Sequence, residues 1–197
     1  MLVGILSLGV GAAFLRCADL GSDPFNTMIF ALSDRFSVSF TLAFVVVSAL
    51  LFAVVLVVKR SLLGVASAII VFGLGPVVEL TLALLPKRPD SLVIQVLFLA
   101  VGVAVISLGC AFCLAADWGV APYDALAPIL DQCLPLSFRL CRILTDCLCV
   151  AVGMLFGAVP GLGTVVVALG LGPIIDFFLR SVARPLLAVP PKAAPSR

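Results

Sequence analysis

Residues 11–26 read Gly11-Ala-Ala-Phe-Leu-Arg-Cys-Ala-Asp-Leu-Gly-Ser-Asp-Pro-Phe-Asn26, and the pattern returns 98 residues later as Gly109-Cys-Ala-Phe-Cys-Leu-Ala-Ala-Asp-Trp-Gly-Val-Ala-Pro-Tyr-Asp124. The identical pairs are Gly11/Gly109, Ala13/Ala111, Phe14/Phe112, Ala18/Ala116, Asp19/Asp117, Gly21/Gly119 and Pro24/Pro122. A second pair, Gly73-Leu-Gly-Pro-Val-Val-Glu79 and Gly170-Leu-Gly-Pro-Ile-Ile-Asp176, lies 97 residues apart. Two pairs at nearly one offset indicate a duplicated unit, which is a common way to build a membrane transporter.

The composition places this duplication in a membrane. The chain is 63% hydrophobic and 11% charged, whereas a soluble domain has about 45–50% apolar and about 25% charged residues. We therefore expect one integral membrane domain over residues 1–197, with repeat 1 at about 1–88, repeat 2 at about 89–184 and a loose tail at 185–197. The net charge of +2, without a basic cluster, excludes nucleic acid as a partner.

Six apolar runs predict six transmembrane helices, and most reach the roughly 20 residues that cross a bilayer. The runs are Met1–Ala18, Phe40–Val58, Leu62–Leu85, Leu92–Ala116, Ile143–Gly157 and Leu162–Leu179. Three spans per copy is an odd number, so the second copy enters the membrane from the opposite side. The predicted fold class is all-α, with two inverted three-helix repeats.

The distribution of charge predicts the topology. One side of the predicted membrane holds eight Lys and Arg residues and the other holds four. The positive-inside rule then places both termini in the cytoplasm, with the chain in the plasma membrane. The first repeat begins inside the first apolar run, which indicates that this run belongs to the mature fold and is not a cleaved signal peptide.

Short half-helices are expected after spans one and four, at Pro24–Leu32 and Pro122–Leu130. Proline suits the first turn of a helix, and nine helical residues cover only about 14 Å. Such an element is re-entrant or lies at the interface. The gate or substrate contacts predicted there are Asp19, Asn26, Asp117 and Asp124. The alternative is that Asp19 and Asp117 are solvated helix caps.

Glu79 and Asp176 lie inside the third and sixth apolar runs. A carboxylate at bilayer depth costs about 2.5–3.5 kcal/mol on insertion scales, so we expect both to bind an ion or a proton. The expected helix-breaking residues are Gly73, Gly75, Pro76, Gly170, Gly172, Pro173, Pro24 and Pro122. The alternative is a helix-end role, in which Asp176 pairs with Arg180 four residues later.

Other polar residues suggest structural roles. Arg142 and Asp146 have the spacing of a pair on one helix face. The seven cysteines lie mostly in apolar surroundings, which favours packing over redox chemistry. The chain has no histidine and no nucleophile–base pair, so we expect no enzyme activity, cofactor or metal.

The repeated pattern resembles the YczE-like group of bacterial membrane proteins, within the YczE/YyaS/YitT set. The resemblance rests on Ala18–Asn26, the following Ser39-Phe40 and the two Gly-Leu-Gly-Pro segments. It implies a small polytopic plasma-membrane protein with no settled biochemical activity. The group typically carries an acidic or amide residue after a Pro-aromatic pair, which here is Asn26 or Asp124.

The leading hypothesis is a transporter or permease for a small molecule or an ion, with its site between spans three and six. One alternative is a membrane accessory protein that does not transport, and another is a substrate-capture subunit of a multi-component importer. The expected partners are the lipid bilayer and an unknown small molecule or ion, with a homodimer or a membrane partner as further alternatives.

Overall fold

The computed structural model describes residues 1–85, 89, 91–116, 118–135, 138–159 and 161–187, and every regular element in this part of the chain is helical. The elements are α1 (Leu2–Ala18), α2 (Pro24–Phe36), α3 (Phe40–Lys59), η1 (Arg60–Leu62), α4 (Val65–Leu84), α5 (Leu92–Ala116), α6 (Leu126–Cys133), α7 (Phe138–Leu155), α8 (Leu162–Phe178), η2 (Leu179–Ala183) and α9 (Arg184–Leu187). The all-helical class predicted from the apolar runs is confirmed for these residues.

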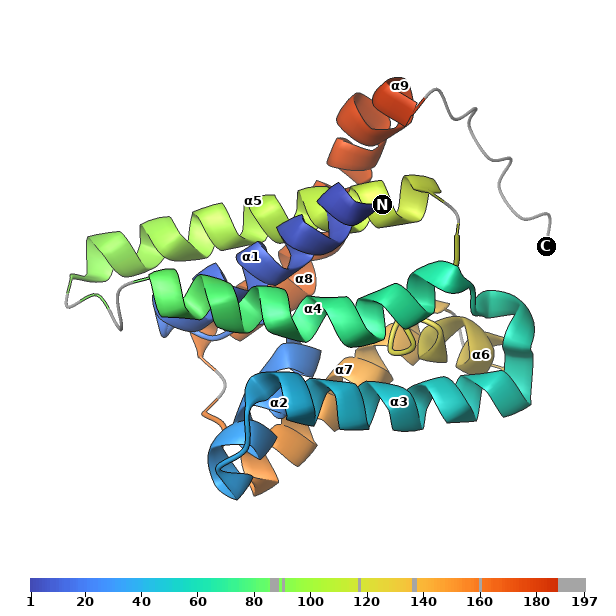
Figure 1. The fold of residues 1–197 in the computed structure, drawn as a ribbon, viewed down its shortest axis with the longest axis horizontal. Coiled ribbons are helices and arrows are strands. Elements are labelled where there is room, and N and C mark those ends of the chain that lie inside the picture. Colours follow the sequence, from blue (N-terminus) through green and yellow to red (C-terminus); the bar gives the residue numbers. More distant parts are fainter. Residues whose placement is uncertain (86–88, 90, 117, 136–137, 160, 188–197) are drawn as a thin grey trace.

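Helices α1, α3, α4 and α5 run roughly along the long axis of the molecule (Figure 1), and the helices pack in two groups. In the first group, α1 packs on both α4 and α5, while α8 packs on α5. In the second group, α2 packs on α3 and α7, and α6 packs on α7. The α3–α4 contact joins the two groups.

Helices α1 and α5, which carry the start of the two sequence copies, lie antiparallel in close contact (Figure 1). Glycines make this approach possible, because a Cβ atom at Gly11 would lie 2.6 Å from the Ile106 nitrogen. The contacts pair Gly4 with Cys113, Gly102 with Leu15, Gly11 with Ile106 and Gly109 with Leu8. Each contact therefore recurs 98 residues later with the partners exchanged.

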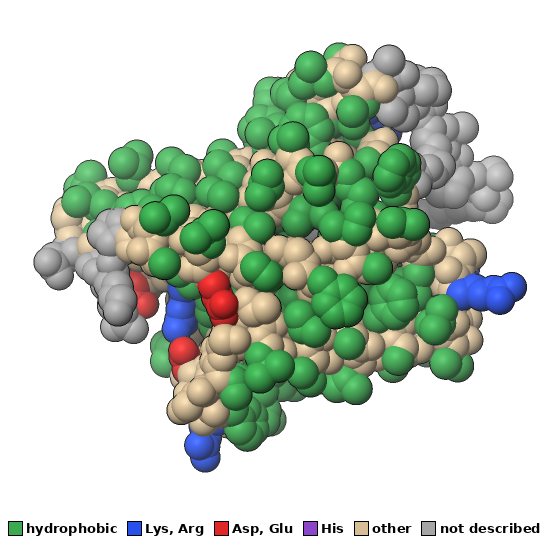
Figure 2. Space-filling view, in the orientation of Figure 1, with side chains coloured by type: hydrophobic (Ala, Val, Ile, Leu, Met, Phe, Trp, Pro, Cys, Tyr) green, Lys and Arg blue, Asp and Glu red, His purple; other side chains and the backbone are tan. Residues whose placement is uncertain are grey.

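Three helical stretches among the described residues are long and apolar enough to cross a membrane: Phe40–Leu62, Val65–Leu84 and Leu92–Ala116. Helix α1 is a shorter apolar helix. Hydrophobic side chains cover most of the visible face (Figure 2), and large ones such as Val57 and Phe72 point outward. An apolar exterior of this kind suits lipid better than water. The prediction of six spans stays a prediction.

The first expected half-helix is longer than predicted. Helix α2 runs for 13 residues from Pro24 to Phe36, with Asp23 as its N-cap. The Asp23 carboxylate accepts a hydrogen bond from the Asn26 backbone nitrogen at 3.1 Å, as expected for an N-cap followed by proline at the first helical position.

The second half-helix starts later than predicted. Pro122 lies in a turn, and α6 begins only at Leu126. Position 121, which corresponds to Asp23, is an alanine. An alanine side chain cannot cap a helix, which accounts for the difference.

The Gly-Leu-Gly-Pro segments do not interrupt their helices. Pro76 lies inside α4 and Pro173 lies inside α8, and both helices continue past them. The breaks expected at Gly73, Gly75, Pro76, Gly170, Gly172 and Pro173 are therefore corrected to continuous helices. Gly75 has a packing role instead, because a Cβ atom there would lie 2.8 Å from the Thr41 Cα.

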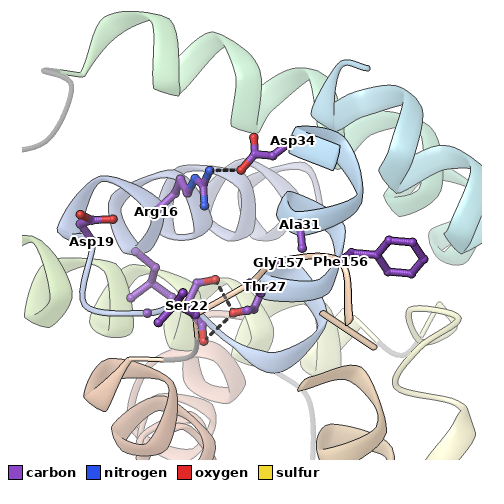
Figure 3. A pocket seen from close by; sticks show the side chains of 12 residues that line it. Arg16, Asp19, Ser22, Thr27, Ala31, Asp34, Phe156 and Gly157 are labelled. Carbon is purple, nitrogen blue, oxygen red and sulfur yellow. Dashed lines mark hydrogen bonds and ion pairs between the residues drawn. The ribbon is translucent and has the colours of Figure 1, made fainter. Parts of the chain in front are cut away.

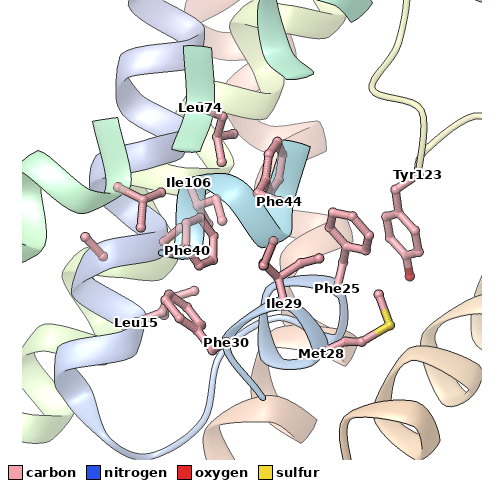
Figure 4. Close-up of a cluster of buried hydrophobic side chains, with 14 of the residues drawn as sticks. Leu15, Phe25, Met28, Ile29, Phe30, Phe40, Phe44, Leu74, Ile106 and Tyr123 are labelled. Carbon is pink, nitrogen blue, oxygen red and sulfur yellow. The ribbon is translucent and has the colours of Figure 1, made fainter. Parts of the chain in front are cut away.

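Aromatic side chains form much of the core between the two helix groups (Figure 4). Phe30 and Phe40 pack with ring centroids 4.5 Å apart, and Phe44 lies 5.9 Å from Phe40. Leu15 and Ile106 bring α1 and α5 into the same cluster. This core holds the start of α2 in place, and with it the residues of the candidate site.

Candidate functional site

The turns after α1 and α5 have matching backbone conformations. Gly21 and Gly119 both have φ of 111°, a region that side-chain-bearing residues rarely adopt. Space is equally restricted, because a Cβ atom at Gly21 would lie 2.7 Å from the Thr164 nitrogen and one at Gly119 would lie 2.5 Å from the Gly64 nitrogen. Both glycines are therefore required by the fold.

Each turn is hydrogen-bonded to the start of a distant helix. The Gly163 nitrogen donates to the Leu20 carbonyl at 2.7 Å, and the Ala66 nitrogen donates to the Trp118 carbonyl at 3.2 Å. Leu20 and Trp118 occupy corresponding positions in the two copies. The start of α8 thus supports the first turn in the way that the start of α4 supports the second.

The two Pro-aromatic segments meet in the interior. The rings of Phe25 and Tyr123 stack with their centroids 4.6 Å apart. Arg142 of α7 lies over the Tyr123 ring at 4.8 Å, 2.7 Å from the Asp124 carboxylate and 3.5 Å from that of Asp146. The Tyr123 hydroxyl donates to Asp146. The expected Arg142–Asp146 pair is confirmed and forms part of a larger cluster.

Asp23 and Asn26 lie on the first-copy side of this cluster. The Asn26 side-chain amide donates to Asp23 at 2.8 Å, while its Oδ1 is buried without a hydrogen-bond partner among the described residues. Burial raises the pKa of the Asp23 carboxyl above its usual value, although the hydrogen bonds from Asn26 and the charge of Arg142 oppose this shift. The cluster therefore combines one guanidinium and three carboxylates with a hydrogen-bond acceptor that has no partner among the described residues. These groups belong to Arg142, to Asp23, Asp124 and Asp146, and to Asn26.

The residues that correspond to this cluster in the first copy are less polar. Phe44 stands where the second copy has Arg142, and Ser48 stands where it has Asp146. Phe44 packs edge-on against Phe25 at 5.9 Å, and Ser48 is only 2% exposed. Arg142 and Asp146 therefore have no charged counterparts in the first copy.

A pocket of about 240 Å³ lies beside the turn after α1 (Figure 3). It is lined by Leu15, Arg16, Asp19, Gly21, Ser22, Thr27, Ala31, Asp34, Phe156, Gly157, Ala158 and Val159. Arg16 and Asp34 form an ion pair at 2.6 Å, and Arg16 also lies 4.6 Å from the centre of the Phe30 ring. The hydroxyls of Ser22 and Thr27 are 2.9 Å apart and hydrogen-bonded.

In the second copy, the described counterparts of three pocket residues are apolar. Ser22, Thr27 and Ala31 correspond to Val120, Ala125 and Ile129. These residues belong to a packed apolar cluster of Val55, Leu62, Leu63, Val120, Ala125, Leu126 and Ile129. The end of α1, which borders the pocket, and the start of α6, which contributes to this apolar cluster, lie toward opposite ends of the long helices (Figure 1).

The two carboxylates predicted to bind an ion have other contacts. Glu79 Oε1 accepts a hydrogen bond from the Thr41 nitrogen at 2.9 Å, in the first turn of α3. Asp176 pairs with Arg180 at 2.9 Å, and both side chains are more than half exposed. In the described part of the chain, α4 packs on α1 and α3 while α8 packs on α5. Packing therefore does not bring Glu79 and Asp176 into one site.

The other predicted residues fall into two groups. Asp19 lines the pocket, whereas Asn26 and Asp124 belong to the cluster around Arg142, in which Asn26 is buried and Asp124 is exposed. Asp117 lies outside the described residues. Inspection of the sequence missed the parts that Arg16, Asp34 and the Ser22–Thr27 pair play in the pocket. A position-by-position comparison of the two copies could have pointed to the Ser22 and Thr27 hydroxyls, because both residues are replaced by apolar residues in the second copy.

Comparison with known proteins places the chain in a family. An uncharacterised protein of Haemophilus influenzae is 28% identical over 189 residues, covering 93% of this chain and 84% of that protein. The uncharacterised protein YyaS of Bacillus subtilis is 27% identical over 192 residues, covering 94% of each. No solved structure matches. The resemblance to the YczE/YyaS set is confirmed. Because the sequence model of DUF6198 matches residues 1–180, the chain belongs to this family of unknown function.

Proposed function

We propose that this protein is a multi-pass membrane transport protein built from two inverted three-helix repeats. Helices α1, α3 and α4 form the spans of one repeat, and α5, α7 and α8 form those of the other. Support comes from the antiparallel α1–α5 contact, whose glycine contacts recur with exchanged partners, and from the matched hydrogen bonds of the two turns. Inverted repeats of this kind are a common transporter architecture.

The observation that carries the proposal is the difference between the two ends. A polar pocket lies at the end where α1 stops, and an apolar cluster fills the corresponding place where α5 stops. In an inverted repeat, corresponding regions face opposite sides of the membrane. One open end and one closed end are the arrangement that alternating access requires at any moment.

The substrate or ion contacts proposed here lie at the two breaks. Asp19 contacts the ligand in the pocket. Asn26 and Asp124 contact it together with Arg142, in the cluster around that arginine. Glu79 and Asp176 become less central, because the first hydrogen-bonds the start of α3 and the second lies in an exposed ion pair. Both termini lie in the cytoplasm, so the pocket faces the outside.

Transport is tested by reconstituting the full chain into liposomes and measuring uptake of radiolabelled small amino acids, amines, carboxylates and monovalent cations. We expect at least one class to enter faster than into protein-free liposomes. We also expect Arg16→Gln and Arg142→Gln to slow this uptake, while Arg35→Gln on the exposed end of α2 does not. If no class enters faster with correctly folded protein present, the transport proposal fails and the accessory-protein alternative takes its place.

A further inference from the structure

We infer that the pocket beside the turn after α1 binds a small zwitterion, a molecule that carries both an ammonium and a carboxylate group. The inference rests on the proposed function in one respect, since it names the substrate class that the pocket would accept for transport. Binding itself can be measured without transport.

The charged side chains of the pocket carry both signs. Arg16 supplies one positive charge, and Asp19 and Asp34 supply two negative charges. Arg16 and Asp34 already neutralise one another at 2.6 Å, with 40% and 63% of their side-chain surfaces exposed. An ion pair as exposed as this is weak, so opening it costs little.

A zwitterion can enter this ion pair without leaving a charge unmatched. Its carboxylate takes the place of Asp34 beside Arg16, and its ammonium takes the place of Arg16 beside Asp34. A simple cation inserted into this pair would match Asp34 alone, and a simple anion would match Arg16 alone. A zwitterion matches both charges at once, which favours it over either kind of ion.

The remaining walls favour a small ligand held in one orientation. Phe30 lies against the Arg16 guanidinium and limits where that group can move. The buried Ser22 and Thr27 hydroxyls, which are hydrogen-bonded to each other, provide polar groups in another part of the same pocket (Figure 3). The volume of about 240 Å³ lies below the roughly 300–1,000 Å³ of pockets for drug-sized molecules. It therefore suits a metabolite of amino-acid size.

The second copy shows that the fold does not need this polar pocket. Val120 and Ile129 occupy the positions of Ser22 and Ala31 and pack in an apolar cluster on the same backbone frame. In the first copy, the buried Ser22 and Thr27 hydroxyls are hydrogen-bonded to one another, and Thr27 also lies within hydrogen-bond distance of the Ser22 carbonyl. The shared backbone therefore does not require the small and polar side chains that border the cavity in the first copy, which is consistent with a ligand-binding role for them.

Binding is tested by thermal unfolding of the detergent-purified full chain. The zwitterionic probes are glycine, L-alanine and β-alanine, the cationic probes are methylammonium and ethylammonium, and the anionic probes are acetate and propionate. Each probe is titrated at matched ionic strength over a concentration range of up to about 20-fold, so that apparent affinities can be compared. We expect saturable stabilisation by at least one zwitterion and at least tenfold weaker effects of the cations and anions.

Four variants locate the binding site. Arg16→Gln and Asp34→Asn each remove one partner of the ion pair and are expected to weaken zwitterion binding at least tenfold. Arg35→Gln makes the same change one residue from Asp34, on an exposed side chain that does not line the pocket, and should leave binding intact. Ala31→Ile introduces the residue found in the second copy, leaves every charge in place, and should abolish binding by filling the space.

Three results would overturn the inference: stabilisation by cations alone that survives Arg16→Gln, zwitterion binding that survives both Asp34→Asn and Ala31→Ile, or no stabilisation by any zwitterion. The last result applies even if Arg16→Gln fails to fold, since it concerns the unmodified chain. Zwitterion binding without uptake into liposomes contradicts the transport proposal only. Uptake of another class of molecule, unchanged by Ala31→Ile, contradicts the zwitterion inference only.

Discussion

The pocket beside the first turn and the apolar cluster beside the second turn share a backbone and differ in side chains. Gly21 and Gly119 have the same φ, and each turn receives a hydrogen bond from the start of a distant helix. Around this frame, Ser22 and Ala31 line a cavity in one copy, whereas Val120 and Ile129 fill the space in the other. The frame therefore determines the turn, and a few side chains determine whether the turn borders a cavity.

The largest effect on stability is expected when the apolar cluster beside the second turn loses a large side chain. Ile129→Ala removes a side chain that is 9% exposed and should lower the free energy of unfolding by about 2–5 kcal/mol, because it leaves a void. The reverse exchange, Ala31→Ile, places its side chain next to an existing cavity and should change stability by less than about 1 kcal/mol. Unfolding in mixed SDS micelles measures both. Equal losses for the two variants would contradict the difference between the ends.

The shared frame predicts equal losses at the two turn glycines. Gly21→Ala and Gly119→Ala place a Cβ atom on a strained backbone and close to another chain segment, so each should cost at least about 2 kcal/mol. Gly170→Ala is the control, because a Cβ atom there meets nothing within 4 Å. Thermal unfolding in detergent compares all three. A loss of stability at only one of the two turns would show that the matched geometry does not contribute equally to stability in the two copies.

The Gly-Leu-Gly-Pro-x-x-acid segments allow a smaller comparison between the copies. Glu79→Ala removes the acceptor of the Thr41 nitrogen and should cost about 1 kcal/mol, while Glu79→Gln keeps an acceptor oxygen and should cost less. Asp176→Ala breaks only an exposed pair and should have little effect. The same unfolding assay applies. Equal sensitivity at both positions would favour a shared ion-binding role over separate structural roles.

The last comparison concerns two sets of arginine contacts. Arg142→Gln disrupts contacts with Asp124, Asp146 and the Tyr123 ring and should lower stability by about 1 kcal/mol. Arg180→Gln affects an exposed helical pair and should produce no measurable change. Thermal unfolding at low and high salt separates them. A larger loss for Arg180→Gln would contradict the central place given to the Arg142 cluster.

Local patterns predicted the helices well. The ends of α1 and α5 follow from the apolar runs and the glycine turns, and the start of α2 follows from Asp23 and Pro24. The continuous α4 and α8 were not foreseen, because a single proline removes only one backbone donor and packing can keep the helix intact. The late start of α6 reflects the missing cap at position 121.

The site was less predictable because its contacts join distant residues. Glu79 reaches Thr41, and Arg142 reaches Asp124 on the preceding segment. Neither contact follows from spacing along one helix, since each depends on how two helices pack. What the sequence does contain is the contrast between Ser22 and Val120, which becomes meaningful once the two copies are aligned position by position.

The orientation of the two ends is tested most directly by chemical labelling of one matched pair of positions. Arg35 in α2 and Cys133 in α6 occupy corresponding positions and are both exposed. In a background without the other cysteines, Cys133 is compared with Arg35→Cys introduced after Cys133→Ser, using a membrane-impermeant maleimide on cells. Inverted repeats with cytoplasmic termini predict that the thiol introduced at position 35 reacts in intact cells and that Cys133 reacts only after the membrane is opened. Reaction of both thiols from the same side would contradict the inverted architecture.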